Sequence, residues 1–236
     1  MKTTILTKVT AAAVAATAML SMTAPANAGT LNFGTDGLKF DKDTTVQFTF
    51  LKSKGAGISN LGIYTSAGLA GKVATLFQER NAADAAGYNA GLASQWLGTA
   101  KNLVGSATAS YTFLAGQVYS LGLTGTLFGN TMTPVYSTSS WNNANRQQAV
   151  FDSVGGSEFN VYQFAGSKKN EGLSAADPAA APLAISFEDI AGGGDRDFND
   201  FTVEAETVPE PITMAGMALG AGGMALARRR RNRKIA

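Results

Sequence analysis

Apolar and polar residues alternate in short segments along most of the chain between residues 30 and 206. In the clearest segment Val46, Phe48 and Phe50 alternate with Gln47 and Thr49. A period of two is typical of a β-strand with one buried face. Further strands are expected within 30–40, 61–66, 110–128, 149–154, 159–164 and 185–206, and a turn over 52–60. Short strands separated by turns predict an all-β domain, a β-sandwich or a jelly-roll-like fold.

The segment 72–104 fits no single pattern. Its apolar residues have partly helical spacing, which glycine and asparagine soon interrupt. A short helix or a long ordered loop over 82–86 is compatible with this pattern, as is a helical turn or a strand pair over 90–104. No long segment has a sustained helical period, which argues against an α/β architecture.

The last two alternating segments flank a loop rich in glycine and oxygen donors, AGGGDRDFND over 191–200. The alternation on both sides predicts a β-hairpin whose tip, 188–200, carries an acidic cluster. The first-choice metal ligands are Asp195, Asp197 and Asp200, with Asn199 adding an amide or carbonyl oxygen. Carboxylates this close repel one another, and Ca²⁺ offsets that repulsion by taking six to eight oxygen ligands. A plain hydrogen-bonded turn is the alternative, because Asp, Asn and Gly are ordinary turn residues.

Glu188 and Asp189 lie where the first strand of this hairpin meets the loop and are second-choice ligands. Strand alternation would direct these two side chains to opposite faces. We therefore expect only one of them to face the loop.

The pattern F-E-D-x-x-x-G-G-D-x-D-F-N-D over 187–200 resembles the signature of a bacterial extracellular family, the domain-of-unknown-function family 4114. A weaker resemblance extends to 46–65 and 111–125. The resemblance implies a secreted, β-rich domain over 29–207. It implies no particular activity, because the role of that family is not established.

Residues 1–28 have the pattern of a secretory signal peptide. Lys2 and Lys8 provide a positive start, an apolar segment follows, and Ala26 and Ala28 fit the small-x-small rule for cleavage. We expect signal peptidase to cut before Gly29.

The chain ends with three features in order over 208–236. Pro209, Glu210 and Pro211 precede an apolar stretch over 212–227, and a basic cluster over 228–234 follows. A helix of this length spans about 24 Å, which is short of a typical hydrocarbon core. The basic end predicts a cytoplasmic C-terminus with the β domain outside. An ordinary single-span tail anchor is the alternative.

These three features resemble the PEP-CTERM sorting signal of Gram-negative bacteria that make extracellular polysaccharide. The resemblance rests on the Pro-Glu-Pro motif at 209–211, the apolar stretch, and Arg228, Arg229, Arg230 and Arg231. It implies processing near the motif by a membrane enzyme, exosortase. The membrane helix would then be transient, as in other removed C-terminal signals. The mature protein would lie at the cell surface or in the extracellular matrix, with polysaccharide as a partner.

Charge and residue usage exclude several classes of function. The chain carries a net charge of +2, but 8 of its 19 basic residues and 1 of its 17 acidic residues lie outside 29–207, so that part carries 11 basic and 16 acidic residues, a net charge of −5. This excess of acid argues against nucleic-acid binding, which rests on neutralising phosphates. The absence of His and Cys excludes Ser-His-Asp triads, Cys nucleophiles, His-ligated zinc and disulfides.

The sequence therefore predicts a non-enzymatic, exported surface or matrix protein that Ca²⁺ stabilises. One rival is a carbohydrate-binding module that uses Trp96, Trp141 or Tyr136, although we expect Trp141 to lie in the core. The other rival is a polysaccharide-processing enzyme with Glu188 and Asp197 as paired carboxylates.

Overall fold

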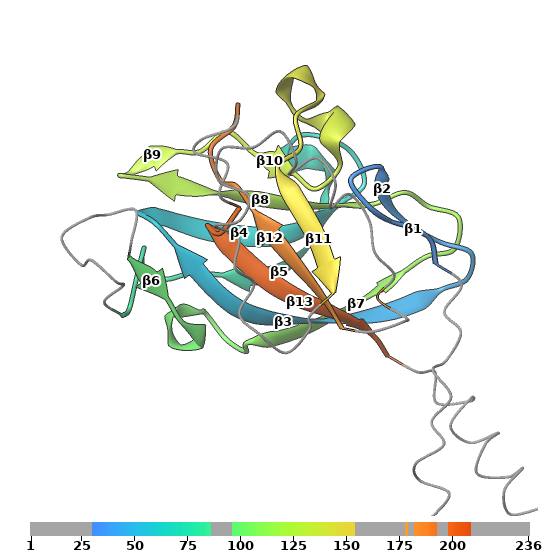
Figure 1. The fold of residues 1–236 in the computed structure, drawn as a ribbon, viewed down its shortest axis with the longest axis horizontal. Coiled ribbons are helices and arrows are strands. Elements are labelled where there is room, and N and C mark those ends of the chain that lie inside the picture. The colour runs from blue at the N-terminus through green and yellow to red at the C-terminus, as the bar shows by residue number, and fades with distance from the viewer. Residues whose placement is uncertain (1–29, 86–95, 154–177, 179–181, 193–197, 209–236) are drawn as a thin grey trace, which may run out of the picture. The chain divides into compact units, whose positions relative to one another are not determined.

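The structure is a computed structural model, and it describes residues 30–85, 96–153, 178, 182–192 and 198–208. Strands make up most of this part of the chain (Figure 1). Their bounds are β1 Thr30–Gly34, β2 Gly37–Phe40, β3 Thr44–Lys54, β4 Gly57–Tyr64, β5 Lys72–Gln78, β6 Leu97–Gly98, β7 Thr108–Phe113, β8 Ser120–Leu127, β9 Asn130–Thr131, β10 Val135–Tyr136, β11 Ala149–Ser153, β12 Leu183–Phe187 and β13 Phe201–Thr207. Among the described residues the only helices are 3-10 turns, at η2 Leu69–Gly71, η4 Ala100–Asn102, η5 Ser139–Trp141 and η6 Asn143–Asn145.

The strands form two larger sheets and one two-stranded ribbon, and every pairing is antiparallel. One sheet has the order β10-β8-β4-β5, with β9 also paired to β8. The other has the order β11-β12-β13-β3-β6, with β7 also paired to β3. Strands β1 and β2 form the ribbon.

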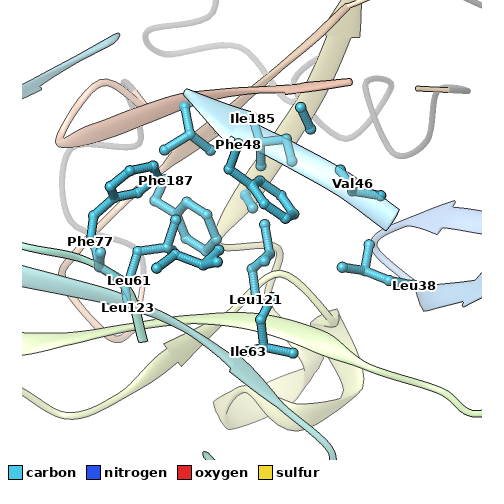
Figure 2. Packing of buried hydrophobic residues seen from close by; sticks show 14 of the residues in the cluster. Leu38, Val46, Phe48, Leu61, Ile63, Phe77, Leu121, Leu123, Ile185 and Phe187 are labelled. Atoms are coloured by element: carbon cyan, nitrogen blue, oxygen red, sulfur yellow. The ribbon is translucent and has the colours of Figure 1, made fainter. Parts of the chain in front are cut away.

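The two larger sheets share one hydrophobic core. Figure 2 shows Phe48, Ile185 and Phe187 of one sheet facing Leu61 and Leu123 of the other. All five side chains are fully buried. Antiparallel sheets that bury their facing side chains together are consistent with the predicted β-sandwich. The finer jelly-roll-like topology stays a prediction.

The predicted C-terminal hairpin is present, and it lies inside the sheet. Strands β12 and β13 pair with Phe187 opposite Phe201, and β13 pairs on its other side with β3 (Figure 1). The expectation of a half-buried strand is wrong for β12, because all its residues are buried. On the second face the hydroxyl groups of Ser186 and Thr202 lie 3.0 Å apart and hydrogen-bond each other, so this polar pair tolerates burial.

The predicted turn over 52–60 is shorter than expected. Strands β3 and β4 extend into it and leave only Gly55 and Ala56 between them. Here the chain passes from one large sheet to the other. Gly55 has a φ of 95°, a conformation that glycine adopts without steric cost. This sheet-to-sheet corner lies beside the acidic residues described below.

The segment 72–104, for which the sequence pattern predicted no single structure, begins with strand β5. Its burial does not alternate cleanly, because Leu76 and Phe77 are both buried, and its pairing with β4 has two register shifts. The burial of β5 therefore departs from a regular period of two. Residues 82–85 form bends and a bridge, which fits the ordered loop.

Several predicted features lie outside the described residues. They are the signal peptide, the strand over 159–164, and the C-terminal motif with its helix and basic cluster. Among the residues that the structure describes, no helix has the length and apolar character to cross a membrane.

Candidate metal centre

Three carboxylates lie close together where strand β12 ends and strand β13 begins. Glu188 and Asp189 directly follow β12, and Asp200 directly precedes β13. Each offers one oxygen, and these oxygens all lie within 4.8 Å of one another. We call these three residues the acidic cluster. The antiparallel register explains the meeting, since the last strand pair is Phe187 opposite Phe201.

Backbone hydrogen bonds fix the position of Asp200. Its N–H donates to the carbonyl oxygen of Phe187 (3.1 Å), and its carbonyl oxygen accepts from the N–H of Lys54 (3.0 Å). Its side-chain Oδ2 accepts from the N–H of Asp189 (2.9 Å). Asp200 therefore ties both ends of the hairpin loop to the β3 strand.

Gln148, which precedes β11, supports the other side of the acidic cluster. Its carbonyl oxygen accepts from the N–H of Glu188 (3.0 Å). Its Nε2 donates to the carbonyl oxygens of Glu188 (3.3 Å) and Ile190 (3.0 Å). Gln148 is itself buried. The sequence pattern gave no sign of this role, since Gln148 is distant in the chain and lies in a polar stretch.

The sheet-to-sheet corner makes room for the acidic cluster. A Cβ atom added to Gly57 would lie 2.8 Å from Oδ2 of Asp189. One added to Gly55 would lie 3.7 Å from Oδ1 of Asp200. The side chain of Asp189 thus packs directly against the backbone of β4, a contact that only glycine at position 57 permits without movement.

Burial makes the acidic cluster costly unless its charge is neutralised. Glu188 is 1% exposed and Asp189 is 6% exposed, while Asp200 is half-buried. Ionised carboxylates this close repel one another, and burial removes the water that would screen them. A donor set of oxygens alone suits a hard cation such as Ca²⁺. The acidic cluster supplies three ligands, and backbone carbonyls, further loop residues and water are the usual sources of the others.

The structure treats the six predicted ligands differently. Asp195 and Asp197 lie outside the described residues, and Asn199 is buried next to Asp200. Contrary to the expectation from strand alternation, the side chains of Glu188 and Asp189 point to the same place and both lie close to that of Asp200. The reason is that β12 ends at Phe187, so its two-residue period does not extend to them.

Phe198 anchors the end of the hairpin loop. Its side chain is completely buried, and its φ is 49°, in the left-handed region that non-glycine residues seldom adopt. Such a conformation costs about 1–3 kcal/mol and persists only where the surroundings enforce it. Burial of this ring therefore fixes the backbone immediately before Asn199 and Asp200.

The aromatic residues named for the rival functions occupy different environments. Trp141 is half-buried, so the expectation that it lies in the core is wrong. It lies on a 3-10 turn, and its ring meets that of Tyr136 edge-on at 5.7 Å. Tyr136 is buried, and Trp96 is half-buried. Of the carboxylate pair proposed for an enzyme, Glu188 is described and Asp197 is not.

Fold and site together define an antiparallel β domain with clustered, largely buried carboxylates. Residues 110–207 match the family model described as a domain of unknown function (DUF4114). Residues 207–231 match the model described as a PEP-CTERM protein-sorting motif. The chain thus carries a DUF4114 domain followed by a PEP-CTERM sorting motif, which implies an exported protein processed by an exosortase. Searches of curated proteins and of solved structures found no match.

The matched family segment is only part of the folded domain. It includes β8 to β13, but β8 pairs with β4 and β13 pairs with β3, and both partners precede residue 110. The acidic cluster also contacts this earlier part of the chain through Lys54 and Gly57. Residues 28–208 form one compact unit, and this unit is the relevant one for experiments.

Proposed function

We propose that this chain is a non-enzymatic surface or matrix protein whose β domain binds and is stabilised by Ca²⁺. The observation that carries the proposal is the acidic cluster, in which two buried carboxylates and a half-buried one place oxygens within 4.8 Å of one another. A cation there would tie Asp200 to Glu188 and Asp189 and so join the two ends of the hairpin loop. A domain with this property would gain rigidity outside the cell, where Ca²⁺ is abundant.

The sorting motif supports the cellular part of the proposal. We infer that exosortase removes the C-terminal segment near 209–211, and that the mature domain remains at the cell surface or in a polysaccharide matrix. In this account the protein is held in the membrane only until its C-terminal segment is removed. The match to a PEP-CTERM sorting motif over 207–231 supports this order of events.

Processing at both ends predicts a specific mass for the mature protein. Intact-mass spectrometry of the protein purified from its host should give a chain that begins at Gly29 and lacks Arg228 to Arg231. A variant with Glu210 replaced by Ala should retain its tail, because the altered residue lies in the Pro-Glu-Pro motif. Detection of the basic cluster in the mature wild-type protein would contradict processing and favour a permanent tail anchor.

Cation binding by the acidic cluster can be measured by isothermal titration calorimetry. We expect Asp189→Asn to weaken Ca²⁺ binding about tenfold or more, since the charge of the ligands sets the affinity of calcium sites. Gly57→Ala should weaken it as well, because the new Cβ would displace the Asp189 carboxylate. Asp36→Asn is the matched control, because Asp36 is exposed in the turn between β1 and β2. Equal Ca²⁺ affinity in all four proteins would place the cation elsewhere.

An enzymatic function would require the acidic cluster to act as an acid/base pair instead. Three carboxylates held together suit a cation better than a pair with separated pKa values, which glycoside hydrolysis needs. The alternative function, carbohydrate binding, would use other residues. Two of these, Tyr136 and Trp141, line a separate cavity, which is described in the next section.

A further inference from the structure

A cavity of about 220 Å³ lies close to the acidic cluster, because Ala191 of the hairpin loop and Gln148 line it. The described residues that line it come from the connections after β4 and β9, from β10, from η5 to η6, from Gln148 before β11, and from Ala191 and Gly192 of the hairpin loop. Ala191 is only two residues from Asp189. The cavity and the acidic cluster are nevertheless distinct, since no residue of the acidic cluster is among the described residues lining the cavity.

The lining of this cavity favours a neutral ligand with both apolar and polar faces. Among the described residues that line it, none carries a formal charge. The half-buried ring of Trp141, packed on the buried ring of Tyr136, provides aromatic surface, while Thr133, Asn143 and Gln148 provide hydroxyl and amide groups. A sugar ring matches this combination, because its C–H face packs on aromatic rings and its hydroxyl groups hydrogen-bond to amides. Phosphorylated or otherwise charged ligands would find no opposite charge among the lining residues that the structure describes.

The aromatic wall is held in place before any ligand binds. Asn142 fixes the loop that carries Trp141: its Oδ1 accepts from the N–H of Tyr136 (2.8 Å), and its Nδ2 donates to the carbonyl oxygens of Tyr136 (2.7 Å) and Arg146 (2.9 Å). The hydroxyl group of Tyr136 accepts from the N–H of Gly68 (2.7 Å). A preformed wall reduces the entropic cost of binding.

Gln148 adds a second, independent observation. It is 1% exposed, and its Oε1 has no hydrogen-bond partner among the described residues, although its Nε2 has two. A buried amide oxygen without a donor is costly and uncommon. A ligand hydroxyl is a donor of the right kind.

We propose that the cavity binds one neutral sugar residue of a glycan, with Trp141 as the stacking surface and Gln148 as a hydrogen-bond partner. The volume limits the ligand, because it is below the about 300 Å³ at which pockets for drug-sized molecules begin. A single ring or the end of a chain fits that limit. The function inferred is recognition of polysaccharide without catalysis.

Gln148 also connects the cavity to the acidic cluster. The same side chain that lines the cavity binds the carbonyl oxygens of Glu188 and Ile190. A cation that orders the acidic cluster should therefore order this wall and strengthen sugar binding. This coupling rests on the proposed calcium function, whereas the sugar site does not.

The test is a glycan array that carries neutral mono- and oligosaccharides of glucose, galactose, mannose and N-acetylglucosamine, with glucuronic acid as the charged comparison. The probe is the mature protein purified from its host in Ca²⁺. We expect a neutral glycan to bind, and Trp141→Ala to reduce its affinity about tenfold or more, as loss of an aromatic contact and its buried area would. Trp96→Ala is the matched control and should leave affinity unchanged, since Trp96 is not among the described lining residues.

Fluorescence provides an independent readout. In Trp96→Phe the only tryptophan is Trp141, so titration with the array's best neutral sugar should change its emission saturably. If Trp141→Ala fails to fold by circular dichroism, Trp141→Leu keeps apolar contact with Tyr136 and should still lose sugar binding. The absence of any neutral glycan ligand, or equal binding by wild type and Trp141→Leu, would overturn the proposal.

Repeating the titration in EDTA separates the two hypotheses. Weaker binding without Ca²⁺ supports the coupling through Gln148. Binding that depends on Trp141 but is equal in EDTA and Ca²⁺ would refute the coupling and leave the sugar site intact. A protein that binds sugar but shows no calorimetric response to Ca²⁺ would refute the calcium function alone.

Discussion

Raising the pH from 4 to 8 is expected to lower the free energy of unfolding by about 3 kcal/mol through one buried carboxylate, Glu79. Glu79 follows β5 and is 3% exposed. The pKa of Glu79 is raised from 4.5 to about 7, chiefly by burial, with a smaller contribution from the negative charge of Asp84. Hydrogen bonds from Ser53, Ser59 and Asn102 lower the pKa and offset part of that rise.

The direction of the pH effect follows from where the proton is bound. The folded state keeps Glu79 protonated up to a pH of about 7, whereas the unfolded chain releases that proton near 4.5. The stabilisation is therefore fully present below pH 4.5 and is lost as the pH rises through 7. Glu79 links both large sheets, since it accepts hydrogen bonds from the hydroxyl of Ser53 on β3 and from the N–H of Ser59 on β4 (2.9 Å).

Replacing Glu79 with Gln tests this prediction. Gln is uncharged throughout, so the stability difference between Glu79→Gln and wild type should change by about 3 kcal/mol between pH 4 and 8, in favour of the variant at pH 8. Urea unfolding at several pH values, in EDTA throughout, measures this difference. Glu206→Gln, at an exposed position on β13, is the control. Parallel pH curves for wild type and Glu79→Gln would refute the assignment.

The sequence predicted the strands better than their arrangement. Alternation of apolar and polar residues located β3 and the β12–β13 hairpin, although only β3 shows the matching alternation of burial along most of its length. It could not show that β13 lies between β12 and β3, since pairing partners distant in the chain leave no local pattern. Strand β5 was not predicted, because its burial departs from a regular period of two.

The candidate site was predictable in composition but not in geometry. The density of Asp, Asn and Gly pointed to the hairpin loop, and the structure brings Glu188, Asp189 and Asp200 together there. The residues that support the acidic cluster could not be predicted from the sequence pattern around the hairpin loop. Gln148, which lies just before β11 and 40 residues before Glu188, contributes through hydrogen bonds, and Gly57 contributes by lacking a side chain.

The second large effect expected is stabilisation of the domain by Ca²⁺. Binding to the folded state alone adds about 2.7 kcal/mol when the cation is present at one hundred times its Kd. For a domain of this size that corresponds to a rise of roughly 5–10 °C in Tm. The physical reason is that the cation offsets the repulsion among the three carboxylates of the acidic cluster.

Variants distinguish the acidic cluster from other cation sites. Asp189→Asn and Asp200→Asn should each reduce the Ca²⁺-dependent rise in Tm, because they remove charge from the described cluster. Asp195→Asn and Asp197→Asn test whether the rest of the loop supplies ligands. Asp36→Asn should keep the full rise, since Asp36 is exposed and outside the acidic cluster.

The most direct test of calcium stabilisation is the melting temperature of the mature protein in EDTA and in millimolar Ca²⁺, followed by circular dichroism. We predict a higher Tm in Ca²⁺ for wild type and a clearly smaller shift for Asp189→Asn. An identical wild-type Tm in EDTA and Ca²⁺ would contradict the account and leave the acidic cluster as a hydrogen-bonded turn.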